Sequence, residues 1–115
     1  MENIHPLYHN PFGVAFQWKR CTAKEVSKVQ LVFRDTGLLF SHDELSQFLI
    51  QINGTLKEVK LCSNCAEDGQ CRAIILETPL KQLSFAISLK ELKALSELVE
   101  GALFQLGLNK MLRQL

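Results

Sequence analysis

The sequence predicts an α+β domain in which two helices pack on one face of an antiparallel sheet of four to five strands. Short apolar runs bounded by turn residues indicate strands, and two amphipathic stretches that each follow a capping box indicate helices. The offset from Ser41 to Ser88 and from Glu44 to Glu91 is 47 residues in both cases, which suggests a repeated β-β-α unit. A chain of 115 residues is long enough for one such domain, 1–115.

The first ten residues, 1–10, are expected to form an irregular N-terminal arm. Pro6 and Pro11 exclude a helix here, so His5 and His9 do not share a helical face as a metal-binding pair would. The next stretch, Phe12 to Trp18, alternates large apolar and small or polar residues and predicts a strand with one buried face. This strand would extend the sheet.

The first β-β-α unit is predicted over 28–58. A hairpin from Lys28 to Ser41 turns at Asp35-Thr36-Gly37, and Ser41 with Glu44 caps the helix that follows. The apolar residues of that helix recur at the spacing of one core-facing stripe. They are Leu45, Phe48, Leu49, Ile52 and Leu56. Gly54 either marks a close approach of the helix to a neighbour or, with Asn53, ends it.

The second unit is predicted over 73–106. Strands around Ala73–Leu76 and Leu83–Ile87 flank a turn that contains Pro79, and Ser88 with Glu91 forms the second capping box. The inward stripe of this helix is Leu92, Leu95, Val99, Ala102, Leu103 and Leu106. Gly101 occupies the position of Gly54 in the first unit, and Gly107 is a plausible C′ stop. The apolar residues after Gly107 would fold back on the core or form a dimer contact.

The segment between the two units, 61–72, is the most distinctive stretch of the chain because it holds three of the four cysteines. Cys62-x-x-Cys65 is the turn that lets two thiolates hold one tetrahedral metal, and Cys71 can return as a third ligand. Cys21 is the predicted fourth ligand, while the three histidines are weaker candidates. The pattern favours a structural zinc site over an iron-sulfur cluster, a redox dithiol at Cys62 and Cys65, or unligated thiols.

Several classes of function are disfavoured by composition and motifs. A formal net charge of +1 offers no field to attract nucleic acid or an anionic membrane, and no apolar run is long enough to span a bilayer. Nothing resembles a secretory signal, which places the chain in the reducing cytoplasm. Nucleophile elbows, phosphate-binding loops and dinucleotide fingerprints are absent, so we expect no catalytic residues. The second hypothesis is that the sheet binds single-stranded nucleic acid through Trp18 and Arg34.

The pieces VQLVFRDTGLLFS with HDELSQF, and CRAIILETP with SFAISLKEL, resemble a small bacterial protein family of unknown function with paired cysteines in or beside its strands. The resemblance covers about Arg20 to Phe104 and implies a compact α+β module with metal binding. It also implies a second cysteine shortly after the first. Lys24 stands in that region of this chain, which weakens the case for a full four-thiolate site.

Together, these observations predict a non-enzymatic binding or regulatory module with a structural zinc. The predicted metal ligands are Cys21, Cys62, Cys65 and Cys71. The expected partner is another protein, with a homodimer through the sheet or the C-terminal segment as one form, and neither a membrane nor nucleic acid is the favoured partner.

Overall fold

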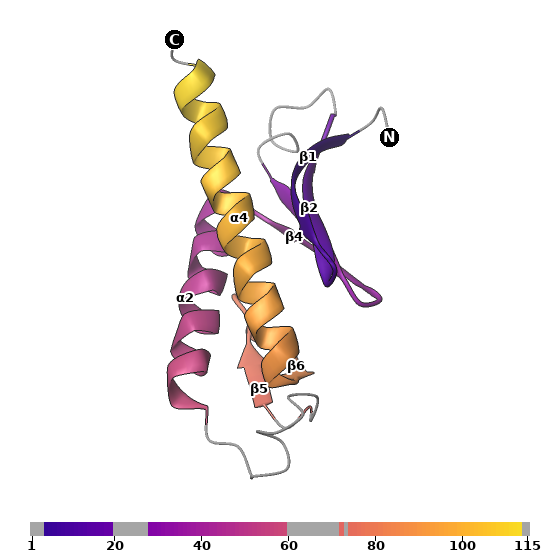
Figure 1. Ribbon diagram of the computed structural model, residues 1–115, viewed down its shortest axis with the longest axis vertical. Helices are drawn as coiled ribbons and strands as arrows, with labels where there is room; N and C mark the ends of the chain where they lie inside the picture. Colours follow the sequence, from indigo (N-terminus) through magenta and orange to yellow (C-terminus); the bar gives the residue numbers. More distant parts are fainter. Residues whose placement is uncertain (1–3, 20–27, 60–71, 73, 114–115) are drawn as a thin grey trace.

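The computed structural model describes residues 4–19, 28–59, 72 and 74–113. Four strands form the main sheet, two further strands form a separate hairpin, and two long helices run antiparallel beside each other against the sheet (Figure 1). In chain order the elements are β1 (Ile4–Asn10), β2 (Gly13–Trp18), β3 (Val29–Phe33), β4 (Thr36–Phe40), α2 (His42–Glu58), β5 (Ile74–Glu77), β6 (Ser84–Ile87) and α4 (Leu89–Arg113). The predicted α+β class, with two helices packed against an antiparallel sheet, is confirmed.

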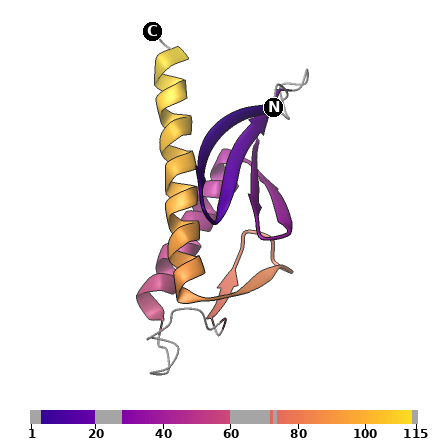
Figure 2. The same ribbon diagram turned by 45° about the vertical axis from the view of Figure 1, so that its right-hand side comes forward.

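The strands are distributed differently from the predicted sheet of two equal β-β-α units. β1 to β4 form a meander in sequence order, and β5 pairs only with β6 in a hairpin of its own (Figure 2). Two-residue turns join β1 to β2 and β3 to β4, so these strands pair locally at little cost in loop entropy. Both β-β-α units exist, but their hairpins belong to different sheets.

The predicted N-terminal arm is wrong for residues 4–10, which form β1. Pro6 lies opposite Phe16 on β2, and the register shifts between Pro6 and Tyr8. β1 is an edge strand, where a missing N–H can face outward without breaking the ladder. The prolines therefore exclude a helix here, as expected, but they do not exclude a strand.

β2 joins the sheet as predicted, but the face that meets the helices is not its aromatic face. Ala15 is fully buried and lies opposite Leu31, a residue of the main core. Phe16 and Trp18 point to the other face, where their rings meet edge-on at 5.1 Å. Helix α4 packs over β1 and β2, and small residues on the inner face allow that close approach. At Gly13, for example, an added Cβ would lie 3.2 Å from Leu98 Cδ2.

Both capping boxes form as predicted. The Ser41 hydroxyl accepts from the Glu44 amide at 3.2 Å, and the Glu44 carboxylate accepts from the Ser41 amide at 2.9 Å. At the second box the corresponding distances are 3.1 and 3.0 Å. The helical stripes face the core, and their fully buried members are Leu45, Phe48, Ile52, Leu92, Leu95, Val99 and Ala102. Leu98 on α4 is also fully buried, although it was not part of the predicted stripe. The core lies between the helices and the two sheets.

The mid-helix glycines differ in what they do. At Gly101, helix α4 comes close to β1, because an added Cβ would overlap the ring of Tyr8. Gly54 and Gly107 have no atom within 4 Å of an added Cβ, and the helices continue through them to Glu58 and Arg113. Gly54 thus neither ends its helix nor marks a contact, and the predicted stop at Gly107 is wrong. At Gly54, packing of the buried Ile52 on the same helix helps to outweigh the weak helix propensity of glycine.

Among the described residues, no helix is long and apolar enough to cross a membrane.

Candidate functional site

Glu91 is the most heavily bonded side chain in the described structure, and one of its partners is Arg72, the last residue of the segment 61–72. Its two carboxylate oxygens accept from Nε and Nη2 of Arg72, each at 3.0 Å. Arg34 Nε adds a contact to Oε2 at 3.3 Å, and the Ser88 amide donates to Oε1 at 3.0 Å. One carboxylate at the start of α4 therefore binds two arginines and its own capping amide. We call Arg34, Arg72 and Glu91 the arginine–glutamate cluster.

Arg34 reaches this cluster from the turn between β3 and β4. Its backbone adopts a φ of 53°, a left-handed conformation that a non-glycine residue adopts only at some cost. Its Nη2 also donates to the Ala86 carbonyl on β6 at 3.0 Å. Arg34 thus joins the main sheet, the separate hairpin and the first turn of α4.

The electrostatics of the cluster favour a permanently charged carboxylate. Partial burial on its own would raise the pKa of Glu91. Two influences outweigh that effect and lower the pKa of Glu91 to about 2. They are the hydrogen bonds from Arg72 and the Ser88 amide, and the positive charges of Arg34 and Arg72. A carboxylate held in this state is a poor proton donor or acceptor near neutral pH, so the cluster is suited to holding structure together.

Sequence reasoning found only the capping role of Glu91. Arg34 and Arg72 are separated from it by 57 and 19 residues, and no local spacing rule connects them. The equivalent position in the first unit gives no clue either. There Glu44 shows the same capping bonds, and no arginine contact to it is found among the described residues.

The predicted metal ligands Cys21, Cys62, Cys65 and Cys71 all lie outside the described residues. Within the described parts of the chain, no group of three or more His, Cys, Asp or Glu side chains could hold a metal ion. The residue that follows Cys71 is Arg72, whose side chain is fixed to the first turn of α4.

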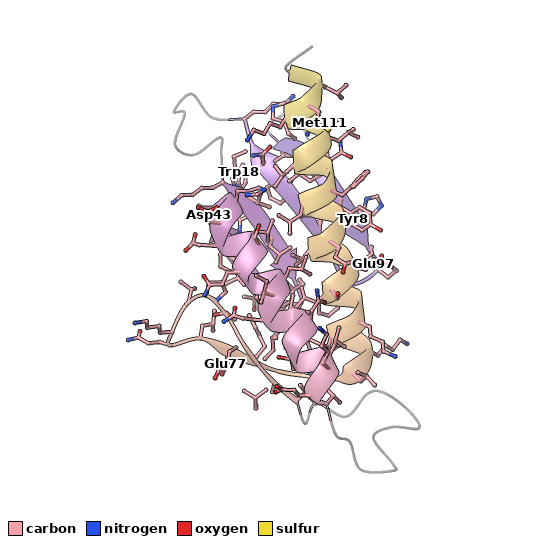
Figure 3. All side chains as sticks on the ribbon, turned by 90° about the vertical axis from the view of Figure 1, so that its left-hand side faces the viewer. Tyr8, Trp18, Asp43, Glu77, Glu97 and Met111 are labelled. Carbon is pink, nitrogen blue, oxygen red and sulfur yellow. The ribbon has the colours of Figure 1, made fainter. Side chains whose placement is uncertain are left out.

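The described residues that flank the cysteines lie at two ends of the molecule. Trp18, three residues before Cys21, and Asp43, in the first turn of α2, both lie in the upper half of Figure 3. The other end of α2, at Glu58, and the start of α4 lie at the opposite end of the long axis (Figure 1). A helix of 17 residues is about 25 Å long. Cys21 follows Trp18 by only three residues, a stretch that spans at most about 11 Å, which is less than half of that length.

The two residues of the nucleic-acid hypothesis do not share a surface. Trp18 is half-buried on the sheet face away from the helices, and its indole N–H donates to Gln30 Oε1 at 3.2 Å. Arg34 lies at the β3–β4 turn, near the start of α4, and is bound to Glu91 and Ala86. The structure therefore gives the pair no common stacking and charge platform of the kind that single strands require.

A groove of about 410 Å³ runs between α2 and the β5–β6 hairpin. Gln51 on α2 donates from Nε2 to the Thr78 carbonyl at 3.3 Å, and its Oε1 is buried with no hydrogen-bond partner. Ile75 is 62% exposed at the groove. Nothing in the sequence marked this region, because a glutamine on a polar helix face is most often solvated.

Further apolar side chains are exposed on the last turns of α4. Phe104 is 72% exposed, and Met111, near the C-terminal end of α4 in Figure 3, is 66% exposed. The homodimer through the sheet or the C-terminal segment stays a prediction.

No family model, no curated protein and no solved structure matches the chain. The function is therefore argued from its own residues.

Proposed function

We propose that this chain is a non-enzymatic binding or regulatory module of the reducing cytoplasm, whose cysteine segment is closed by a structural zinc. The proposed ligands are Cys62, Cys65 and Cys71, with Cys21 as the fourth. Zinc bound by thiolates in tetrahedral geometry would supply folding free energy to a segment that has few apolar residues of its own. The surface of the folded domain would bind the partner protein.

The observation that carries the proposal is the anchoring of Arg72 by Glu91. Closing a loop around a metal costs less conformational entropy when one end of the loop is already fixed. Arg72 directly follows Cys71, and its two contacts of 3.0 Å to Glu91 tie that end to a helix. The charged, fully bonded state of Glu91 also supports a structural role over acid–base catalysis.

The test is the effect of metal removal on stability. Wild-type protein purified without chelator or affinity tag should lose thermal stability when a strong chelator is added, and equimolar zinc should restore it. Cys62→Ser, Cys65→Ser and Cys71→Ser should each remove the response to chelator. A wild-type protein whose melting curve is the same with chelator and with zinc would refute the zinc site.

Cys21 needs its own variant, because its described neighbours lie far from those of the other three. If Cys21→Ser abolishes the chelator response as well, the four-thiolate site stands. If the response survives in Cys21→Ser and disappears in Cys62→Ser, the site has three cysteine ligands from one segment and a different fourth ligand.

A further inference from the structure

We infer that the groove between α2 and β5 is a peptide-binding site, in which an extended segment of a partner protein adds a third strand to the β5–β6 hairpin. This inference rests on the binding role proposed above and gives it a surface and a kind of partner. It does not depend on zinc. The groove leaves several hydrogen-bonding groups unpaired, and these groups indicate what kind of molecule it binds.

The hairpin has two outer edges, and among the described residues only the β6 edge accepts a hydrogen bond from outside the hairpin. On the β6 edge, Arg34 Nη2 donates to the Ala86 carbonyl at 3.0 Å. A carbonyl that accepts from outside the hairpin points away from the partner strand. Ile75 lies directly opposite Ala86, and in an antiparallel pair such opposed residues both direct their N–H and C=O groups outward. Ile75, and Glu77 two residues further along β5, therefore present backbone donors and acceptors at the uncovered edge.

The groove beside that edge contains a buried acceptor without a donor. Gln51 Oε1 is inaccessible to solvent and unpartnered, although its Nε2 is held by Thr78. Leaving a buried polar atom unpaired is costly, and such atoms often await a ligand or water. A backbone N–H of an added strand is a donor of the right kind, and it would lie between α2 and β5.

The side chains at the groove set the chemistry of the peptide. Ile75 is 62% exposed and Leu80 45% exposed, and both line the groove with Pro79. These apolar groups favour aliphatic side chains at alternate positions of the bound strand, since alternate residues of a strand share one face. The partner is therefore an extended, aliphatic-rich peptide segment.

The experiment begins with random heptapeptides displayed on phage and selected on the full-length protein. Enriched peptides are synthesised with a fluorescein label, and their affinity is measured by fluorescence anisotropy. Methylating backbone nitrogens one at a time should weaken binding at least about tenfold at alternate positions and leave the positions between them unaffected, because only every second N–H pairs with β5.

Two glutamine variants test the groove without disturbing the fold. Gln51→Met removes the unpartnered acceptor together with the 3.3 Å bond from Nε2 to the Thr78 carbonyl. It should weaken the peptide about fivefold, while its melting temperature stays close to that of wild type because the two changes in the fold offset each other. Gln47→Met, one turn earlier on the groove side of α2, is the matched control and should stay within about twofold of wild type.

The inference is overturned if no enriched peptide loses affinity in Gln51→Met, or if methylation has no alternating pattern. It is also overturned if the uncovered edge proves to pair with a second copy of this chain, seen as a concentration-dependent dimer that the selected peptides dissociate. Zinc content measured on the same samples separates failure of this site from failure of the zinc proposal.

Discussion

Replacing Glu91 by glutamine removes the charge of the arginine–glutamate cluster and keeps most of its shape. Glutamine can still accept the Ser88 amide as the third residue of a capping box, so the helix start is preserved. The variant loses the ionic contacts to Arg72 and Arg34. It therefore isolates the electrostatic contribution of the cluster to folding.

The size of the stability loss follows from the pKa of Glu91, which folding lowers from 4.5 to about 2. A shift of that size corresponds to about 3 kcal/mol as an upper bound. Arg72 is 59% exposed, so solvent and salt screen its part of the interaction. We expect Glu91→Gln to lower the free energy of unfolding by about 1 to 3 kcal/mol at pH 7, or the melting temperature by about 4 to 12 °C.

The direction of the pKa shift determines how the stabilisation by Glu91 changes with pH. Because folding lowers the pKa of Glu91, its stabilisation is present in full above about pH 4.5 and is lost as the pH falls toward 2. The difference between wild type and Glu91→Gln should therefore shrink over that range. Urea titrations at several pH values measure it, and Glu44→Gln is the matched control because it removes a capping carboxylate for which no arginine contact is described. A loss for Glu91→Gln that equals the loss for Glu44→Gln, or that does not change with pH, would refute the reasoning.

Four further substitutions test the packing. Gly101→Ala should lower the free energy of unfolding by about 1 to 3 kcal/mol because the new Cβ overlaps the Tyr8 ring, whereas Gly54→Ala, in open space, should raise it by up to about 1 kcal/mol. Equal effects of the two substitutions in thermal melts would contradict the placement of β1. Phe48→Ala should cost about 3 to 5 kcal/mol in urea titrations, since this side chain is fully buried, and a cost below about 1 kcal/mol would show that it is not in the core. Asn10→Ala removes a side chain that accepts from two turn amides and donates to the Ala94 carbonyl, so about 1 to 2 kcal/mol should be lost; an unchanged melting curve would contradict these bonds.

The helices could be predicted from the sequence because their signals are local. A serine, a glutamate three residues later and an apolar stripe fix where each helix starts and which face is buried, and both starts were correct. The helix ends were less predictable. Gly107 is an ordinary stop signal, but α4 continues through it to Arg113.

The sheet and the site depend on contacts between distant residues. The pairing of β1 with β2 follows from a two-residue turn, but the prolines in the first ten residues hid the strand. The sequence predicted one buried face on β2, whereas the centre of the strand is buried on both faces, with Ala15 toward the helices and Phe16 on the other side. The meeting of Arg34 and Arg72 at Glu91 could not be found from spacing, because three separate elements bring these side chains together.

The most direct test of the proposed function is the zinc content of the native protein, measured with a count of its reactive thiols before and after a chelator is added. The account predicts one zinc per chain, and thiols that react slowly with a thiol reagent until the chelator releases the metal. Four thiols that react freely at the outset, in protein that carries no stoichiometric zinc, would contradict it.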